Sequence, residues 1–184
     1  AGLMIISVAT ETVAAQLASM SAAEVAEKWA LASVVGLAIG NGGGRILAGF
    51  LSDKIGRKIT MFVFFVFQAL LLLVLSQAAN NEVLSSAPVL ILIVALIGAN
   101  YGSNLALFPS ITKDFFGLKN FGMNYGLVFT AWGVGGFMLA KLAGIIFDKT
   151  QSFNFAYFCA SGLLVVASIV VLLVKPPHHP TDSV

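Results

Sequence analysis

Five apolar stretches of membrane length follow one another along this chain, with only short polar connectors between them. A bilayer core about 30 Å thick needs roughly 20 apolar residues in helical conformation, and each stretch meets that length. Apolar residues make up 59% of the 184 residues and charged residues only 10%, which excludes a soluble globular domain. The predicted transmembrane helices cover residues 29–51, 59–77, 87–108, 121–147 and 153–174.

A sixth apolar segment lies at the N-terminus but is too short to cross a bilayer. Residues 1–9 are apolar, and the polar side chains of Thr10, Glu11 and Gln16 follow. The chain also starts without an initiator Met, a signal peptide or a basic flank. We therefore expect a helix that is cut through its middle, in a fragment of a longer chain.

The basic residues gather in alternate connectors, and this asymmetry predicts the orientation of the chain in the lipid bilayer. If residues 52–58 face the cytoplasm, the same side holds Lys54, Arg57, Lys58, Lys113, Lys119 and Lys175. The other side holds only Lys28 and Lys149, with Lys141 near them. We expect a multi-pass protein of the plasma (inner) membrane with a cytoplasmic C-terminus. Because the net charge is only +2 and the basic residues form no stripe, we expect no nucleic-acid partner.

The connectors are short, so consecutive helices are expected to be adjacent and antiparallel. Residues 111–118 are predicted to form a separate amphipathic helix at the membrane surface, with Ile111, Phe115 and Phe116 opposite Lys113 and Asp114. The proline-rich residues 176–184 are predicted to be a disordered cytoplasmic tail. The tail histidines and the lone Cys159 suggest no metal site and no disulfide, and we expect no cofactor.

A charged motif, Gly-Phe-Leu-Ser-Asp-Lys-Ile-Gly-Arg-Lys, joins the first two predicted membrane helices. Its Gly49, Asp53, Gly56, Arg57 and Lys58 resemble the loop motif of the major facilitator superfamily. In such a motif Gly49 would let helices pack closely, and Asp53 would cap or pair with a neighbouring helix end. The two basic residues would hold the loop on the cytoplasmic side, so we predict that this motif controls the change of access state.

Four further segments carry a more specific resemblance. They are Gly40-Asn41-Gly42-Gly43-Gly44-Arg45 and residues 100–109, 115–117 and 124–126. Together they resemble the C-terminal half of the oxalate/formate antiporter family, which is related to the monocarboxylate transporters. The resemblance implies an all-α membrane protein in which residues 1–175 form the seventh to twelfth helices of a twelve-helix major facilitator fold. The partner of this half would be the N-terminal six-helix half of the same transporter.

Arg45 is the residue that we expect to bind the substrate. A central Arg in a membrane helix costs about 2.5–3.5 kcal/mol on insertion scales, so such a charge needs a function. Its planar guanidinium can hold a carboxylate by two parallel hydrogen bonds, and Asn41 lies one turn earlier on the same helix face. In the resembling family an arginine at this position is linked to anionic substrate. The alternative is that Arg45 extends toward the interface or bonds helix carbonyls.

Trp132 marks a departure from the oxalate-exchanging members of that family. They carry a lysine in a Tyr-Thr-Ala-Lys-Gly context, whereas this chain has Phe129-Thr130-Ala131-Trp132-Gly133. Oxalate has two carboxylates and would be matched by two cations, whereas lactate, pyruvate and formate each have one carboxylate and would be matched by one cation. We therefore predict a monocarboxylate, with Trp132 and Phe129 against its carbon chain; packing alone is the alternative for Trp132.

Polar residues of the third predicted helix are further candidates. Asn100 and Tyr101 are predicted substrate contacts, and Asn100 shares a helix face with Asn104. Interhelical hydrogen bonding is the alternative role for these amides. Because Asn41 cannot titrate, a coupled H⁺ would have to be carried by Glu11, by the absent half or by the substrate, and anion exchange without protons stays open.

The predicted function is secondary active transport of a small organic anion by alternating access. Dicarboxylate exchange of the oxalate/formate type and a major facilitator carrier for another solute are the alternatives. A channel subunit is a further alternative. An enzyme is not expected, because the predicted spans hold no His, no Asp and a single Cys.

Overall fold

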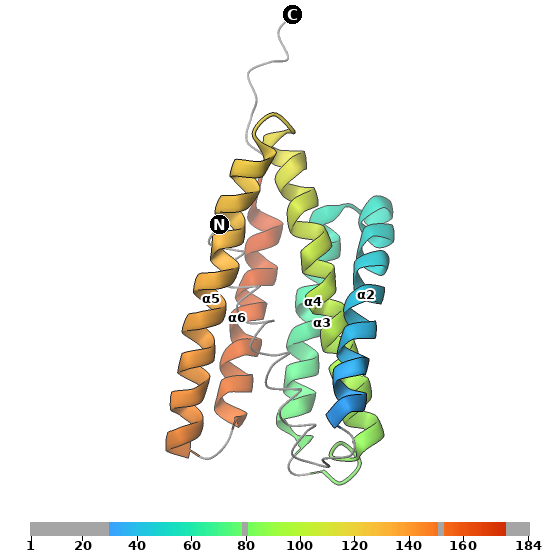
Figure 1. Ribbon diagram of the computed structural model, residues 1–184, viewed down its shortest axis with the longest axis vertical. Helices are drawn as coiled ribbons and strands as arrows, with labels where there is room; N and C mark the ends of the chain where they lie inside the picture. The colour runs from blue at the N-terminus through green and yellow to red at the C-terminus, as the bar shows by residue number, and fades with distance from the viewer. Residues whose placement is uncertain (1–29, 79–80, 151–152, 176–184) are drawn as a thin grey trace, which may run out of the picture.

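The computed structural model describes residues 30–78, 81–150 and 153–175, which form a bundle of long helices (Figure 1). Each described helix is long and apolar enough to cross a membrane, and no strand occurs in these three segments. The helices are α2 (Ala30–Ile55), α3 (Arg57–Ser76), α4 (Ala87–Phe116), α5 (Phe121–Thr150) and α6 (Asn154–Leu173). They confirm the all-α membrane fold and five of the six predicted helices, while the expected sixth lies outside the described residues.

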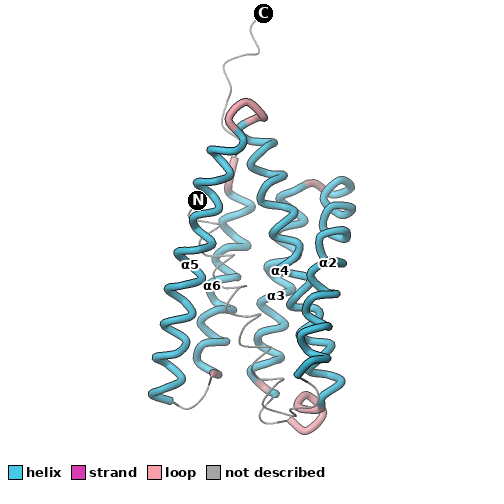
Figure 2. Tube along the Cα trace, in the orientation of Figure 1, coloured by secondary structure: helices cyan, strands magenta, loops and turns pink. Residues whose placement is uncertain are grey.

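Two glycines with positive φ mark the sharpest chain reversals. Gly56 has φ +85° and separates α2 from α3 by a single residue, and Gly117 has φ +71° directly after α4. Residues with a Cβ rarely adopt this backbone conformation, so glycine is needed at both positions. Both reversals lie at the upper end of the bundle in Figure 1, and Figure 2 shows them as short loops between long helices.

Helix α4 corrects one sequence prediction, because it continues through Pro109 to Phe116 without a separate surface helix. Proline removes one backbone donor and normally ends a helix. Here the Ser110 and Thr112 hydroxyl groups donate to the carbonyl oxygens of Ala106 and Phe108, at 2.8 and 2.7 Å. Ile111 and Thr112 are buried, so packing of this last stretch against the bundle outweighs the lost bond.

Consecutive helices are in contact and antiparallel, as the short connectors predicted, but they are not the main packing partners. The most extensive contacts join α2 to α4 and α3 to α6. Consecutive helices do alternate in direction, so α2 and α4 run parallel to each other (Figure 1). Short connectors fix direction, but the choice of partner depends on which helix faces fit together.

Glycine backbone explains the close approach of α2 and α4. A Cβ placed on Gly40 or Gly44 would lie 1.9 or 2.0 Å from the carbonyl oxygen of Ala95 or Ala99. From the opposite side, a Cβ on Gly98 or Gly102 would lie 2.4 or 2.0 Å from a carbonyl oxygen of α2. These four glycines occupy two positions spaced by four residues on each helix, the small-residue spacing that lets membrane helices touch through their backbones.

One end of the bundle collects the basic side chains. The last turns of α2, α4 and α6 and the first turns of α3 and α5 meet there, at the upper end in Figure 1. The Lys58 ammonium group donates to the carbonyl oxygen of Leu172 at 2.9 Å, and so holds the start of α3 against the end of α6. Lys54, Arg57, Lys58, Lys113, Lys119 and Lys175 all lie in these terminal turns or in the residues next to them, as expected from the sequence.

The glycine contact predicts opposite effects for two adjacent substitutions. Gly44→Ala places a methyl group into the backbone of α4 and should destabilise the fold by about 1–3 kcal/mol, as overpacking does. Gly43→Ala is the matched control, because its Cβ would meet nothing within 4 Å. It should be neutral or stabilise α2 by up to about 1 kcal/mol through helix propensity. Equal midpoints of thermal unfolding for the two purified variants would contradict this packing.

Candidate functional site

Arg45 and Asn41 form a hydrogen-bonded pair on α2. The Nε–H group of Arg45 donates to Oδ1 of Asn41 at 3.0 Å, and Arg45 is exposed in the described bundle. Because a guanidinium only donates, the Asn41 amide must turn its oxygen toward Arg45 and its NH₂ group away. No described residue accepts a hydrogen bond from that NH₂ group or from the two Nη nitrogens. The pair therefore presents only donors and a net positive charge.

The depth and pairing of Arg45 fit a binding role. Arg45 lies ten residues before the end of α2, which corresponds to about 15 Å along a helix, close to half the thickness of a bilayer core. Among the described residues no carboxylate lies within ion-pair distance of it, and both ion pairs of this part of the chain belong to Arg57.

The glycines around Arg45 divide into two functional sets. Gly40 and Gly44 serve the contact with α4. Gly42 and Gly43 are exposed and meet nothing within 4 Å among their neighbours. Only this second pair leaves open surface beside Arg45.

A second polar group joins α4 to α5. The indole N–H of Trp132 donates to the hydroxyl oxygen of Tyr101 at 3.0 Å. Phe129 stacks on Trp132 at a centroid distance of 5.5 Å, and Tyr125 and Phe121 continue the series at 5.6 Å each. The indole donor is thus used within the protein, whereas the hydroxyl proton of Tyr101 stays free to be donated elsewhere.

The two groups are linked through the helix backbone. A Cβ on Gly102, the residue after Tyr101, would lie 2.0 Å from the carbonyl oxygen of Asn41. Among the described residues no hydrogen bond joins Arg45 or Asn41 to Tyr101 or Trp132. Their relative position is therefore set by the α2–α4 contact.

Asn100 lies apart from both groups. Its side chain is fully buried, and its Nδ2 donates to the carbonyl oxygen of Leu96 at 2.9 Å. Asn104 is also buried, with 3% of its surface exposed. Burial and a bond within its own helix argue against substrate contact for Asn100, and among the described residues neither amide bonds to another helix as the interhelical alternative predicted.

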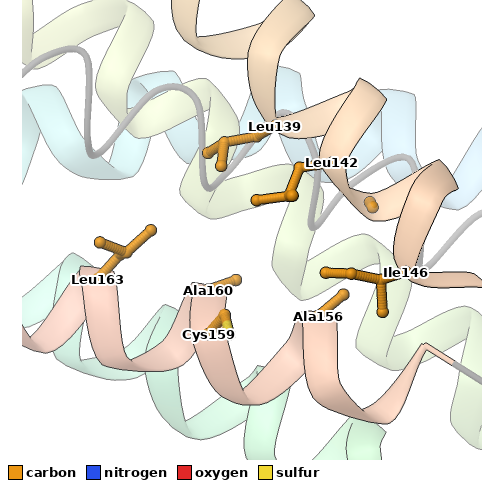
Figure 3. A pocket seen from close by; sticks show the side chains of 8 residues that line it. Leu139, Leu142, Ile146, Ala156, Cys159, Ala160 and Leu163 are labelled. Carbon is orange, nitrogen blue, oxygen red and sulfur yellow. The ribbon is translucent and has the colours of Figure 1, made fainter.

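An apolar cavity of about 70 Å³ lies between α5 and α6 (Figure 3). It is lined by Leu139, Leu142, Ala143, Ile146, Ala156, Cys159, Ala160 and Leu163. This lining carries no charge, so the cavity does not suit an anion. In the three described segments no three His, Cys, Asp or Glu residues come together to hold a metal ion.

The charged motif forms a network around Arg57. Its Nη1 donates to Oδ1 of Asp53 at 2.8 Å and to the hydroxyl oxygen of Ser52, and its Nε donates to Oδ2 of Asp114 at 3.2 Å. Arg57 thus ties the start of α3 to the ends of both α2 and α4. Neither Ser52 nor Asp114 was predicted from the sequence as a partner of Arg57. Ser52 lies within the charged motif and Asp114 is an acidic residue near the end of α4, but no local pattern links either of them to Arg57.

One expectation about this motif agrees with the structure and one needs correction. Asp53, in the last turn of α2, pairs with Arg57 at the start of α3, the neighbouring helix, and Asp114 adds a second carboxylate from the end of α4. A Cβ added to Gly49 would meet nothing within 4 Å, so close helix packing in the described bundle does not depend on this glycine. Its carbonyl oxygen accepts a bond from the Ser52 hydroxyl at 2.9 Å.

Comparison with known proteins identifies the relatives of this chain. The sequence model of the Major Facilitator Superfamily matches residues 1–184. The uncharacterized MFS-type transporter YhjX of Escherichia coli is 32% identical over 73% of the chain, which amounts to 31% of that protein. The oxalate:formate antiporter of Oxalobacter formigenes is 39% identical over 50% of the chain, and mouse monocarboxylate transporter 14 is 36% identical over 51%.

The chain spans only part of these relatives. The matched residues cover 21% of the oxalate:formate antiporter and 18% of monocarboxylate transporter 14. The predicted resemblance to these two groups is confirmed at the level of sequence similarity.

The Arg57 network predicts a local effect of removing the charge of Asp114. In Asp114→Asn the tie between α3 and α4 weakens, and the free energy of local opening should fall by about 0.2–1 kcal/mol, as for other partly exposed ion pairs. Hydrogen exchange of the backbone amides of residues 52–60 should accelerate accordingly. Lys113→Gln removes an adjacent exposed charge outside the network and is the control. Unchanged exchange in Asp114→Asn would show that this ion pair does not hold the connector.

Proposed function

The chain belongs to the Major Facilitator Superfamily, and from that premise we propose that residues 1–175 are the C-terminal half of a secondary transporter for a small monocarboxylate. Transport would proceed by alternating access, in which this half and an N-terminal six-helix half rock about a central site. Residues 176–184 would follow as a cytoplasmic tail, and the basic end of the bundle would face the cytoplasm.

The donor-only surface of Arg45 and Asn41 is the observation that carries the proposal. With Nε held by Asn41, the two Nη nitrogens stay available for a carboxylate in an end-on, two-bond arrangement. The Asn41 NH₂ group can add a third bond from one helical turn away. An aspartate at position 41 would neutralise the guanidinium, whereas the amide orients it and leaves its charge for the anion.

Charge balance supports a monocarboxylate. Arg45 is the cation that this half offers at mid-depth, and position 132 holds an indole whose donor is already bonded to Tyr101. Trp132 and Phe129 would therefore offer apolar ring surface to the carbon chain. The Tyr101 hydroxyl group would donate a hydrogen bond to the carboxylate, so one charge and two neutral donors, Tyr101 and Asn41, would define the site.

Binding of the anion would also drive closure. An unpaired guanidinium in a closing, water-poor cavity is costly, and a bound carboxylate removes that cost. Empty closure would then be disfavoured, as exchange requires. Asn41 cannot carry a proton, so in proton symport the proton would have to be carried by a titratable group in the other half, by Glu11 or by the substrate itself.

Dicarboxylate exchange is the second candidate, because the oxalate:formate antiporter is 39% identical over half of the chain. It would require a second cation near the site. The N-terminal half would have to provide that cation, since Trp132 stands where oxalate-exchanging members carry a lysine.

The first functional prediction concerns Arg45. In the full transporter reconstituted in liposomes, Arg45→Ala should lower kcat/KM for radiolabelled lactate or formate by about 10- to 150-fold, which corresponds to loss of about 1.5–3 kcal/mol of charged hydrogen bonding. Arg45→Lys should give a kcat/KM between those of the wild type and Arg45→Ala, because an ammonium group keeps the charge but not the planar fork. Lys141→Gln, which removes an exposed cation of α5, is the control and should transport normally. Saturable uptake that is unaltered in Arg45→Ala would exclude the proposed site.

The second functional prediction concerns the count of cations. Trp132→Lys restores the charge that the oxalate-exchanging relatives carry and should raise the uptake of oxalate relative to lactate. Trp132→Phe is the matched control, because it removes the bond to Tyr101 without adding charge. Competition of unlabelled oxalate, lactate and formate against labelled substrate measures the preference. An identical preference in Trp132→Lys and Trp132→Phe would refute the charge-balance argument.

A further inference from the structure

Three amide side chains in the interior of the bundle have polar atoms without hydrogen-bond partners. Both amide atoms of Gln68 on α3, both of Asn104 on α4 and Oδ1 of Asn100 have none among the described residues. Gln68 and Asn100 are 0% exposed and Asn104 is 3% exposed. Unsatisfied polar atoms are costly in protein interiors and more so at membrane depth, where surrounding water is absent.

The Arg57–Asp114 ion pair fixes the register of α3 against α4 and brings these amides to one level. Gln68 lies eleven residues after Arg57, which is three helical turns along the same face. Asn104 lies ten residues before Asp114, and Asn100 one turn further. The two helices run in opposite directions (Figure 1). The residue spacing from that ion pair therefore puts Gln68 near the level of the turn that holds the two asparagines.

This layer lies between the two most tightly joined helix pairs. The most extensive contacts join α2 to α4 and α3 to α6, and the α3–α4 contact between these two pairs is smaller. We call the α3–α4 contact the seam. Its charged end is closed by Arg57, and the register of the two helices places the amides midway along it.

We propose that the seam holds one or more ordered water molecules bound by Gln68, Asn100 and Asn104. The unpartnered atoms comprise two NH₂ groups and three carbonyl oxygens. A cation would face the NH₂ groups and an anion would face the oxygens, whereas water both donates and accepts. Buried water typically takes about three bonds from such otherwise unsatisfied groups.

Small side chains also occur at this level of the two helices. Ser103 and Ala69 adjoin Asn104 and Gln68 in sequence, and both are buried. Ser161 of α6 donates to the carbonyl oxygen of Ala69 at 3.2 Å, so a third helix brings a hydroxyl group to this level. The hydroxyl oxygens of both serines can accept a further bond from water.

The experiment uses X-ray hydroxyl-radical footprinting of the intact protein in nanodiscs, because radicals form where water is bound. Leu72→Met places a reactive probe one turn from Gln68 at a fully buried position, and the exchange of Leu for Met conserves volume. Native Met61, also fully buried on α3 but two turns from Gln68 toward the charged end, is the internal control. The introduced methionine should oxidise several-fold faster than Met61.

A second variant separates bound water from general loosening of α3. Adding Gln68→Leu and Asn104→Leu removes the two amides that lack partners at both atoms and should lower oxidation of the introduced methionine to the rate of Met61. Density for water between the three amides at high resolution would also support the layer. Equal, slow oxidation of both methionines in Leu72→Met, or density showing Gln68 bonded directly to an asparagine with no water, would overturn the proposal.

Discussion

Bare glycine backbone between α2 and α4 sets the spacing on which the rest of the bundle depends. Gly40 and Gly44 lie against carbonyl groups of α4, and Gly98 and Gly102 lie against carbonyl groups of α2. Neither helix can shift far along this contact without a collision of backbone atoms, because cores and interfaces are close-packed. The two helices therefore behave as one body, and Arg45 and Tyr101 keep a fixed relation although they belong to different helices.

Much of the fold was predictable because membrane length and apolarity are read directly from a sequence. The five described helices, the reversal at Gly56 and the basic end of the bundle all follow from such local features. The partner of each helix was not predictable, since helices that are apolar all round give little sign of which face packs where. The helix end predicted before Pro109 is wrong for a related reason. Helix α4 continues through Pro109 because the following turn is buried, and burial is a tertiary property.

The candidate site was predictable to a similar degree. An arginine at membrane depth with an asparagine one turn away implies an anion site from chemistry alone, and the structure joins the two. The bond from Trp132 to Tyr101 and the tie from Arg57 to Asp114 span 31 and 57 residues of sequence. No local pattern specifies such contacts, because each depends on how α4 lies against its neighbours. The sequence did contain the residues, but not their pairing.

Helix α2 connects the proposed anion site to the charged motif. Ser52 follows Arg45 by seven residues, two helical turns or about 10 Å along the same helix face. Any displacement of α2 on anion binding would therefore also move Ser52 and Asp53 and change their contacts with Arg57. Since α2 is held to α4 by glycine backbone, and α3 to α6 by Lys58 and Ser161, such a displacement must be taken up at the seam. Arg57 is the side chain that crosses the seam at its charged end, so the strength of its two ion pairs sets how readily the two helix pairs move against each other.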